Sequence, residues 1–223
     1  MSSQKPGFIF GVNNIPFDRE IYKKEVDSCK KCSLGYYRTN TVIGEGKMPS
    51  DLVFIGEGPG DQEDREGRPF VGRAGELLNH SLTQVGLARN EVWITNIVKC
   101  RAFEQVDYKK VNRPPRTEEI QACFGFLEKE IEAVSPKVIV ALGSPSASSL
   151  LGKNFKTITQ DRGKWFNFKN IKVIPVFHPA YVLRQKGRVY DKTFETFLSD
   201  LQEAKNSVNL KIDTWNLPLF KKV

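Results

Sequence analysis

Four cysteines are the only thiol side chains of this 223-residue chain, and their spacing suggests a shared metal site. Cys29 and Cys32 form a C-x2-C pair. Cys100 follows an apolar segment, and Cys123 lies in a segment with helical periodicity. Thiolates at these spacings bind either a structural zinc ion or an iron–sulfur cluster, and spacing alone does not choose between them. The alternative is that Cys100 and Cys123 are ordinary buried thiols, because only the C-x2-C pair is a local signature.

Polar residues follow each of four short apolar segments rich in Val and Ile. Residues 56–64 are rich in glycine and carboxylates, Asn96 comes late in the second segment, and Ser144 and His178 follow the third and fourth. In an open parallel sheet, ligands bind at the carboxyl ends of the strands. We therefore expect these residues to lie along one edge of a sheet and to form the functional site there.

The glycine-rich loop indicates a tight turn whose backbone approaches a ligand closely. Gly56, Gly58 and Gly60 follow a predicted strand, but the third glycine of the GxGxxG pattern is missing. Glu63 and Asp64 come next, and their charges would repel a pyrophosphate. A dinucleotide cofactor is therefore disfavoured.

Strands and helices are predicted to alternate along the chain. The apolar runs lack strict alternation, as expected of strands covered on both faces, and occur at residues 51–56, 92–98, 137–142 and 172–177. Helical periodicity and capping residues indicate helices at residues 74–85, 117–134, 144–151 and 194–201. This order predicts an α/β fold, a three-layer α/β/α sandwich with a central four-stranded parallel sheet. We expect one domain over residues 1–223, with a core at about 25–205 and short extensions at both ends.

The positive charge of the chain is concentrated in one segment. Lys and Arg number 34 against 26 Asp and Glu, giving a net charge of +8, and residues 151–192 alone hold ten basic and two acidic side chains. Interleaved aromatic residues make this segment suited to a polyanion such as nucleic acid, although a solvated lysine-rich face is the alternative. No apolar run is long enough to span a membrane and no signal peptide is evident, so we expect a cytoplasmic protein without disulfides. We also expect a monomer.

Four motifs occur in a characteristic order, namely GEGPGDQED at 56–64, RPFVGRAG at 68–75, TNIVKC at 95–100 and HPA at 178–180. Together with the cysteines, they resemble the family 4 uracil-DNA glycosylases, the iron–sulfur branch of that superfamily. The resemblance implies a [4Fe–4S] cluster on the four cysteines. It also implies a monofunctional DNA repair enzyme that hydrolyses the bond between uracil and deoxyribose and leaves an abasic site.

The resemblance further implies how the uracil base is recognised. An enzyme acting on a base in a duplex must flip that base into a pocket. Phe70 would stack on the uracil, and Asn96 would accept from N3–H and donate to O4, a pattern that cytosine reverses. His178 would donate a hydrogen bond to O2 as negative charge develops on the leaving base. Glu63 would crowd the position of the thymine methyl group.

The group that orients the attacking water is left open. Glu57 and Gly58 would line the sugar side of the site, and Pro59 would also contact the substrate. The best-known members of the superfamily have an aspartate where this chain has Gly58, so Glu57 and Glu63 are the candidates for the general base.

DNA contacts are expected near the third and fourth strands. Ser144 and Arg184 would bind phosphates, and Val182 or Leu183 would wedge into the gap left by the base. The connection between Cys100 and Cys123 is longer than usual for the family. Two alternatives stay open: an inactive protein of the same fold that binds uracil-containing or single-stranded DNA, and a zinc-stabilised nucleotide-binding or interaction module.

Overall fold

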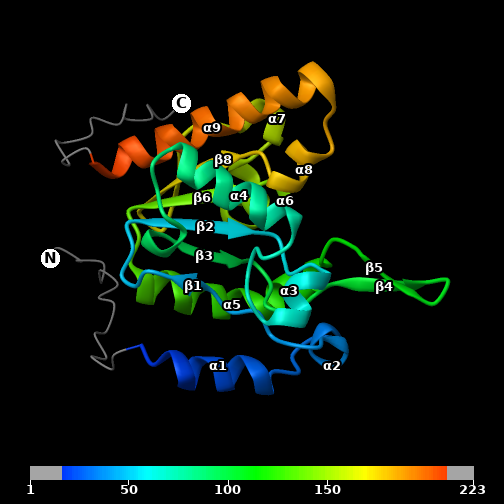
Figure 1. The fold of residues 1–223 in the computed structure, drawn as a ribbon. Coiled ribbons are helices and arrows are strands. Elements are labelled where there is room, and N and C mark those ends of the chain that lie inside the picture. Colours follow the sequence, from blue (N-terminus) through cyan, green and yellow to red (C-terminus); the bar gives the residue numbers. More distant parts are fainter. Residues whose placement is uncertain (1–16, 210–223) are drawn as a thin grey trace, which may run out of the picture.

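A six-stranded sheet forms the centre of the computed structural model, which describes residues 17–209 (Figure 1). Its strands, in spatial order, are β1 (Glu45–Gly46), β3 (Trp93–Asn96), β2 (Leu52–Gly56), β6 (Val138–Leu142), β8 (Ile171–Val176) and β7 (Phe166–Phe168). The four predicted strands are the parallel centre, β3-β2-β6-β8. The edge strands β1 and β7 pair antiparallel and were not predicted.

Helices cover both faces of the sheet, so the predicted α/β fold is confirmed. One face packs against α4 (Arg73–Gln84), α8 (Pro179–Leu183) and α9 (Gly187–Asn209). The other packs against α1 (Arg19–Ser28), α2 (Leu34–Tyr37), α5 (Thr117–Val134) and α6 (Ser144–Leu151). Successive residues of a strand point to opposite faces, so Val53 joins the α5 side and Phe54 the α4 side. Figure 1 shows α4 and α9 above the sheet and α5 below it.

Shorter elements occupy the connections. They are α3 (Asp61–Glu66), α7 (Ile158–Asp161), two 3-10 turns at Arg89–Glu91 and Gly152–Asn154, and a separate hairpin of β4 (Phe103–Val106) and β5 (Lys109–Asn112). The predicted helices are all present, and α9 begins seven residues earlier than its apolar stripe indicated. Gly86, predicted to stop α4, has a left-handed φ of 67°. No helix of the described part of the chain is long and apolar enough to cross a bilayer.

Helix α1 attaches the segment before the sheet to α5. Asp18 caps its N-terminus by accepting from the backbone N–H groups of Glu20 and Ile21. The buried Tyr22 hydroxyl donates to the Phe126 carbonyl and to Glu130, at 3.0 Å each. This attachment brings the C-x2-C pair at the end of α1 beside the middle of α5. The predicted terminal extensions, residues 1–16 and 210–223, lie outside the described residues.

Candidate active site

A cleft of about 610 Å³ lies at the carboxyl ends of β2, β3 and β8. Residues from four distant motifs line it: Glu57, Gly58, Pro59, Glu63, Phe70, Asn96, His178 and Arg184. The sheet therefore brings the predicted base-binding and catalytic residues to one edge. Ser144, Val182 and Leu183 do not line this cleft.

His178 is held in one tautomer by the backbone of α8. It precedes that helix as the N-cap, and its Nδ1 accepts from the Ala180 N–H at 3.0 Å. Nδ1 is therefore unprotonated, and in the neutral ring the proton is on Nε2. Burial, assisted by the nearby charge of Arg184, lowers the pKa of His178 to about 4. At neutral pH the side chain is an uncharged hydrogen-bond donor.

Phe70 forms a wall of the cleft in a strained backbone conformation. Its side chain is only 5% exposed and its φ is +52°, which is unusual for a bulky residue. Its ring centroid lies 5.9 Å from that of His178, with a tilt of 30° between the planes. At Gly75, any Cβ would come within 1.9 Å of the Phe70 carbonyl oxygen, so this loop also requires glycine in α4.

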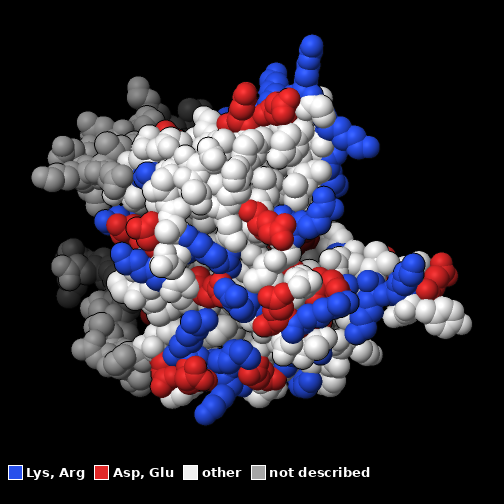
Figure 2. All heavy atoms as spheres, viewed as in Figure 1, with Lys and Arg blue, Asp and Glu red and all other residues white. Residues whose placement is uncertain are grey.

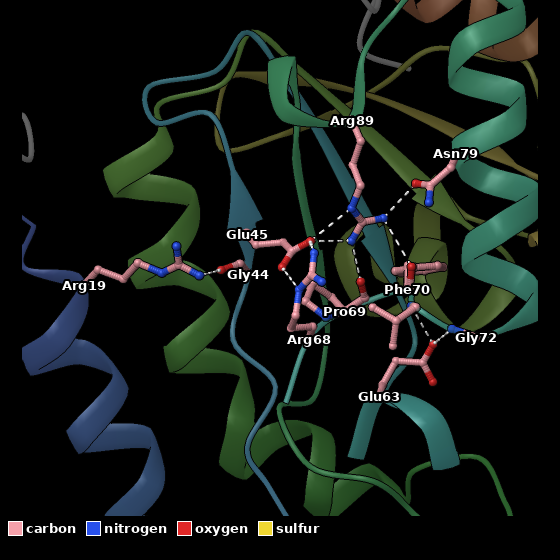
Figure 3. Close-up of polar contacts among 11 residues, drawn as sticks. Arg19, Gly44, Glu45, Glu63, Arg68, Pro69, Phe70, Gly72, Asn79 and Arg89 are labelled. Atoms are coloured by element: carbon pink, nitrogen blue, oxygen red, sulfur yellow. Dashed lines mark hydrogen bonds and ion pairs between the residues drawn. The ribbon is translucent and has the colours of Figure 1, made fainter. Parts of the chain in front are cut away.

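Arg89 holds the Phe70 loop from behind (Figure 3). Its guanidinium donates to the carbonyls of Pro69 and Phe70 and to Asn79 Oδ1. It also pairs with Glu45 Oε1 at 2.7 Å, and the same carboxylate binds Arg68 at 3.0 Å. These contacts hold the strained turn at Phe70 in place. Sequence reasoning missed Arg89 and Glu45, because 44 residues separate them and neither belongs to a motif.

Glu63 ties the glycine-rich turn to the Phe70 loop. One carboxylate oxygen accepts from the N–H groups of Val71 and Gly72, at 3.0 and 2.9 Å, and the other accepts from Gly60 at 3.0 Å. Backbone donors thus occupy both carboxylate oxygens. This geometry favours a positioning role for Glu63 over the predicted role of general base.

The Glu57 carboxylate, unlike that of Glu63, is not fully hydrogen-bonded by the protein. Its Oε1 is buried and has no hydrogen-bond partner among the residues described. Burial raises the pKa of this carboxyl group above its ordinary value. A buried acceptor without a partner needs a ligand or an ordered water molecule. Glu57 is therefore the better placed of the two predicted bases.

The Asn96 carboxamide is also available to a ligand. The residue is 2% exposed, yet its side chain has no hydrogen-bond partner within residues 17–209 and borders the cleft. A Cβ at Gly56 would come within 2.5 Å of both Asn96 Oδ1 and Phe70 Cζ. Glycine at this position is what allows the amide and the aromatic ring to sit together.

The four cysteines surround a small cavity behind the cleft. Cys29 is the C-cap of α1, Cys32 lies in the turn between α1 and α2, Cys100 follows β3, and Cys123 lies in α5. Burial raises the pKa of the Cys100 thiol to about 12, while the Arg38 guanidinium, which donates to Cys100 Sγ at 3.4 Å, favours the thiolate. In the described part of the chain, no three His, Cys, Asp or Glu side chains converge closely enough to hold one metal ion.

Comparison with known proteins identifies the family. The model of the uracil DNA glycosylase superfamily matches residues 43–202. The type-4 uracil-DNA glycosylase of Sulfurisphaera tokodaii is 46% identical over 172 residues, covering 74% of this chain and 75% of that protein. The type-4 enzyme of Thermotoga maritima is 43% identical over 192 residues, covering 85% and 94%. This chain belongs to the type-4 uracil-DNA glycosylases. The resemblance stated from the motifs is thus confirmed.

In this type-4 family member, a buried ion pair lies between the cleft and the cysteines. Lys99 and Glu130 are completely buried, with Nζ 2.8 Å from Oε2. Lys99 also donates to Thr95 Oγ1 and to the Asn96 carbonyl, at 2.7 and 2.9 Å. The second Glu130 oxygen accepts from Tyr22 and from the Gly44 N–H. Sequence reasoning missed this network, although a lysine directly between the apolar run 92–98 and Cys100 was a signal.

The predicted DNA contacts are only partly accessible. Val182 is completely buried in the α4–α9 core, which contradicts its predicted role as a wedge, because its position on α8 points it into the protein. Leu183 packs half-buried beside that core, and Ser144 is half-buried at the start of α6. Arg184 is exposed at the cleft. Figure 2 shows Lys and Arg side chains over the turn between α8 and α9.

The basic segment 151–192 is not one uniform surface. Arg162 pairs with Asp200, Lys164 with Asp161, and Lys169 with Glu128. These cations are partly neutralised by acidic residues, two of which lie outside the segment. The region beside the cleft, around Arg184, is the part of the segment best placed for DNA.

Proposed function

We propose that this chain hydrolyses the N-glycosidic bond of uracil in DNA and leaves an abasic site for base excision repair. The observation that carries the proposal is the fixed, neutral tautomer of His178 beside Phe70 and an unpaired Asn96 amide. The type-4 relatives carry the same activity in their names. The expected substrate is uracil-containing DNA, and the expected state is a monomer.

Uracil would be distinguished from cytosine by the Asn96 amide. The flipped base would stack on Phe70, with its Watson–Crick edge toward Asn96. Uracil offers a donor at N3 and an acceptor at O4, whereas cytosine offers an acceptor and a donor at these positions. An amide held in one orientation leaves groups unpaired with the wrong base, which is costly in a buried site.

Cleavage would transfer the bonding electron pair from C1′ to uracil N1. The base departs as an anion and the sugar becomes cationic, after which the oxygen of a water molecule bonds to C1′. His178 Nε2–H would donate to uracil O2 as charge develops there, and a neutral donor keeps its proton through this step. Glu57 would accept the proton that this water loses as its oxygen bonds to C1′, and the carboxylate would stabilise the cationic sugar.

The four cysteines would hold a [4Fe–4S] cluster. The four thiols line one cavity, and thiolates are the ligands that iron–sulfur clusters take. Together with the type-4 relatives, this supports the cluster. The bound cluster would supply a structural cross-link between the end of α1, the loop after β3, and α5.

A duplex oligonucleotide with a single uracil tests the proposed reaction. Incubation with the protein followed by alkali should break the labelled strand at the uracil, and the matched thymine duplex should stay intact. Retained binding without strand scission would overturn the proposed hydrolysis and favour the inactive DNA-binding protein of the same fold.

Glu57→Gln should remove the acid limb of the pH profile. The group must be deprotonated to accept from water, so kcat/KM should fall as pH decreases through the raised pKa of Glu57. This limb should lie above the ordinary range of a glutamate. The amide variant should be slower by about 10²-fold at neutral pH and lack the limb. An unchanged profile in Glu57→Gln would assign the limb to another group.

Cys32→Ser should lose colour and stability together. Metal ligation is coupled to folding, so removing one ligand should lower both iron content and Tm. Anaerobically purified wild-type protein should be brown, whereas a zinc protein would be colourless. Ser28→Ala, on the neighbouring turn, is the control. A stable variant with full iron content would show that Cys32 is not a ligand.

A further inference from the structure

The β4–β5 hairpin stands apart from the central sheet. Its two strands pair only with each other, from Phe103 opposite Asn112 to Val106 opposite Lys109. Figure 1 shows it projecting from the body on the side where the arrows of the central strands end. Nearly every residue is exposed on both faces of the ribbon. An isolated two-stranded hairpin is marginally stable in water, so its attachment to the body needs a cause.

Arg101 provides that attachment. It is 4% exposed and donates to Asn112 Oδ1 at 2.7 Å and to the Lys110 carbonyl at 3.1 Å. It also forms an ion pair with Asp61 at the start of α3. Asn112 and Arg113 line the cleft that contains His178. The base of the hairpin is therefore a fixed part of the active-site wall.

The ribbon carries cations on both faces. Residues 101–116 include five basic and two acidic side chains. Lys110 lies over the Phe103 ring, 4.5 Å from its centroid, while Lys109 lies on the opposite face beside Val106. Figure 2 shows Lys and Arg along the hairpin, with acidic and uncharged atoms at its tip. Arg101 and Arg113 are engaged by carboxylates, and Arg116 lies outside the ribbon at the start of α5. Lys109 and Lys110 are therefore the cations of the ribbon itself that are available to a polyanion.

An aromatic side chain occupies the tip. Asp107 and Tyr108 both have left-handed φ, +44° and +64°, as a two-residue turn of the hairpin type requires. Glycine or asparagine would fit the second position with less strain. The residue at this second turn position is Tyr108, whose side chain is fully exposed, at 102%. A bulky residue kept in a strained, solvated position points to a contact outside the chain.

We propose that this hairpin is a second DNA-binding element, in which Lys109 and Lys110 contact phosphates and Tyr108 stacks on an unpaired base of DNA leaving the cleft. The inference rests on the proposed function and extends it. Stacking on an aromatic ring is independent of base identity and requires a base that is free of its partner. The hairpin should therefore favour single-stranded substrates, in which the bases beside the uracil are unpaired.

Tyr108→Ala tests the stacking. On a single-stranded uracil oligonucleotide, KM should rise at least about fivefold, with a smaller rise on the matched duplex and no change in kcat. Tyr36→Ala removes an exposed tyrosine from α2 and is the matched control. Equal KM values for Tyr108→Ala and wild type on both substrates would overturn the stacking role. Such a result would favour a protein partner for Tyr108 at the tip of the hairpin.

The double variant Lys109→Ala/Lys110→Ala tests the phosphate contacts. The slope of log Kd against log salt for single-stranded DNA should become shallower by about 1.4, for two lost contacts. The control is Lys24→Ala/Lys137→Ala, which also removes two positive charges, one from α1 and one from the opposite end of the sheet. Equal slopes in the two double variants would overturn the contacts. This binding measurement does not need turnover, so a protein without glycosylase activity would refute the proposed function and still test the hairpin.

Discussion

His178→Ala should lower kcat for uracil release by about 10²–10³-fold while changing the Kd for uracil-containing DNA little. The donor acts on charge that develops only as the bond breaks, so its loss falls on the transition state. Because the Ala180 N–H already occupies Nδ1, Nε2 is the atom that can donate to the base. Single-turnover cleavage together with fluorescence anisotropy separates the two effects.

The other histidine supplies the control. His80 lies on α4 and stacks on Phe194, 6.0 Å between ring centroids, away from the residues that line the cleft. His80→Ala should cleave at nearly the wild-type rate. Since the pKa of His178 is about 4, the imidazole stays neutral from about pH 5 upward, and no limb from this residue should appear between pH 5 and 8. Equal losses of turnover and binding in His178→Ala would contradict the assigned role.

Glu130→Gln should lower the free energy of unfolding by about 3–5 kcal/mol, because it leaves the completely buried Lys99 ammonium without its counter-charge. Urea unfolding followed by tryptophan fluorescence measures the change. The Lys99 ammonium also binds the Asn96 carbonyl, so KM for uracil-DNA should rise in the same variant.

Two further variants isolate the ion pair. Lys99→Met combined with Glu130→Gln removes both charges and should recover part of the lost stability. Lys129→Ala removes an exposed neighbour that pairs with Glu25 on the surface, and should cost less than about 1 kcal/mol. A Glu130→Gln variant as stable as Lys129→Ala would show that the buried charge finds another partner.

The central strands could be predicted from sequence because each is a short apolar run followed by a polar or glycine residue. The edge strands could not: β1 has two residues, and β7 has only three. The β4–β5 ribbon is exposed on both faces and so lacks the hydrophobic alternation that identifies a strand.

Cleft residues were predictable where they stand in motifs, as Asn96 and His178 do. Arg89, Glu45 and Glu130 were not, because each acts through a partner distant in the chain, and single-sequence spacing carries no sign of such pairs. The wedge prediction failed at Val182 for a related reason. A sequence gives the type of side chain that follows His178, but the direction in which a one-turn helix points it depends on the packing of α8 against α4 and α9.

The contacts by which Arg89 holds the Phe70 loop have a consequence for how the protein samples DNA bases. The aromatic platform is set by guanidinium and carboxylate groups on the protein itself, with Glu45 on an edge strand outside the cleft. The base-binding pocket is therefore preorganised, with a fixed size and shape before DNA binds. Ordinary bases gain little binding free energy by entering this pocket. Discrimination during genome scanning therefore depends on which nucleotides flip out of the helix readily and then fit the pocket.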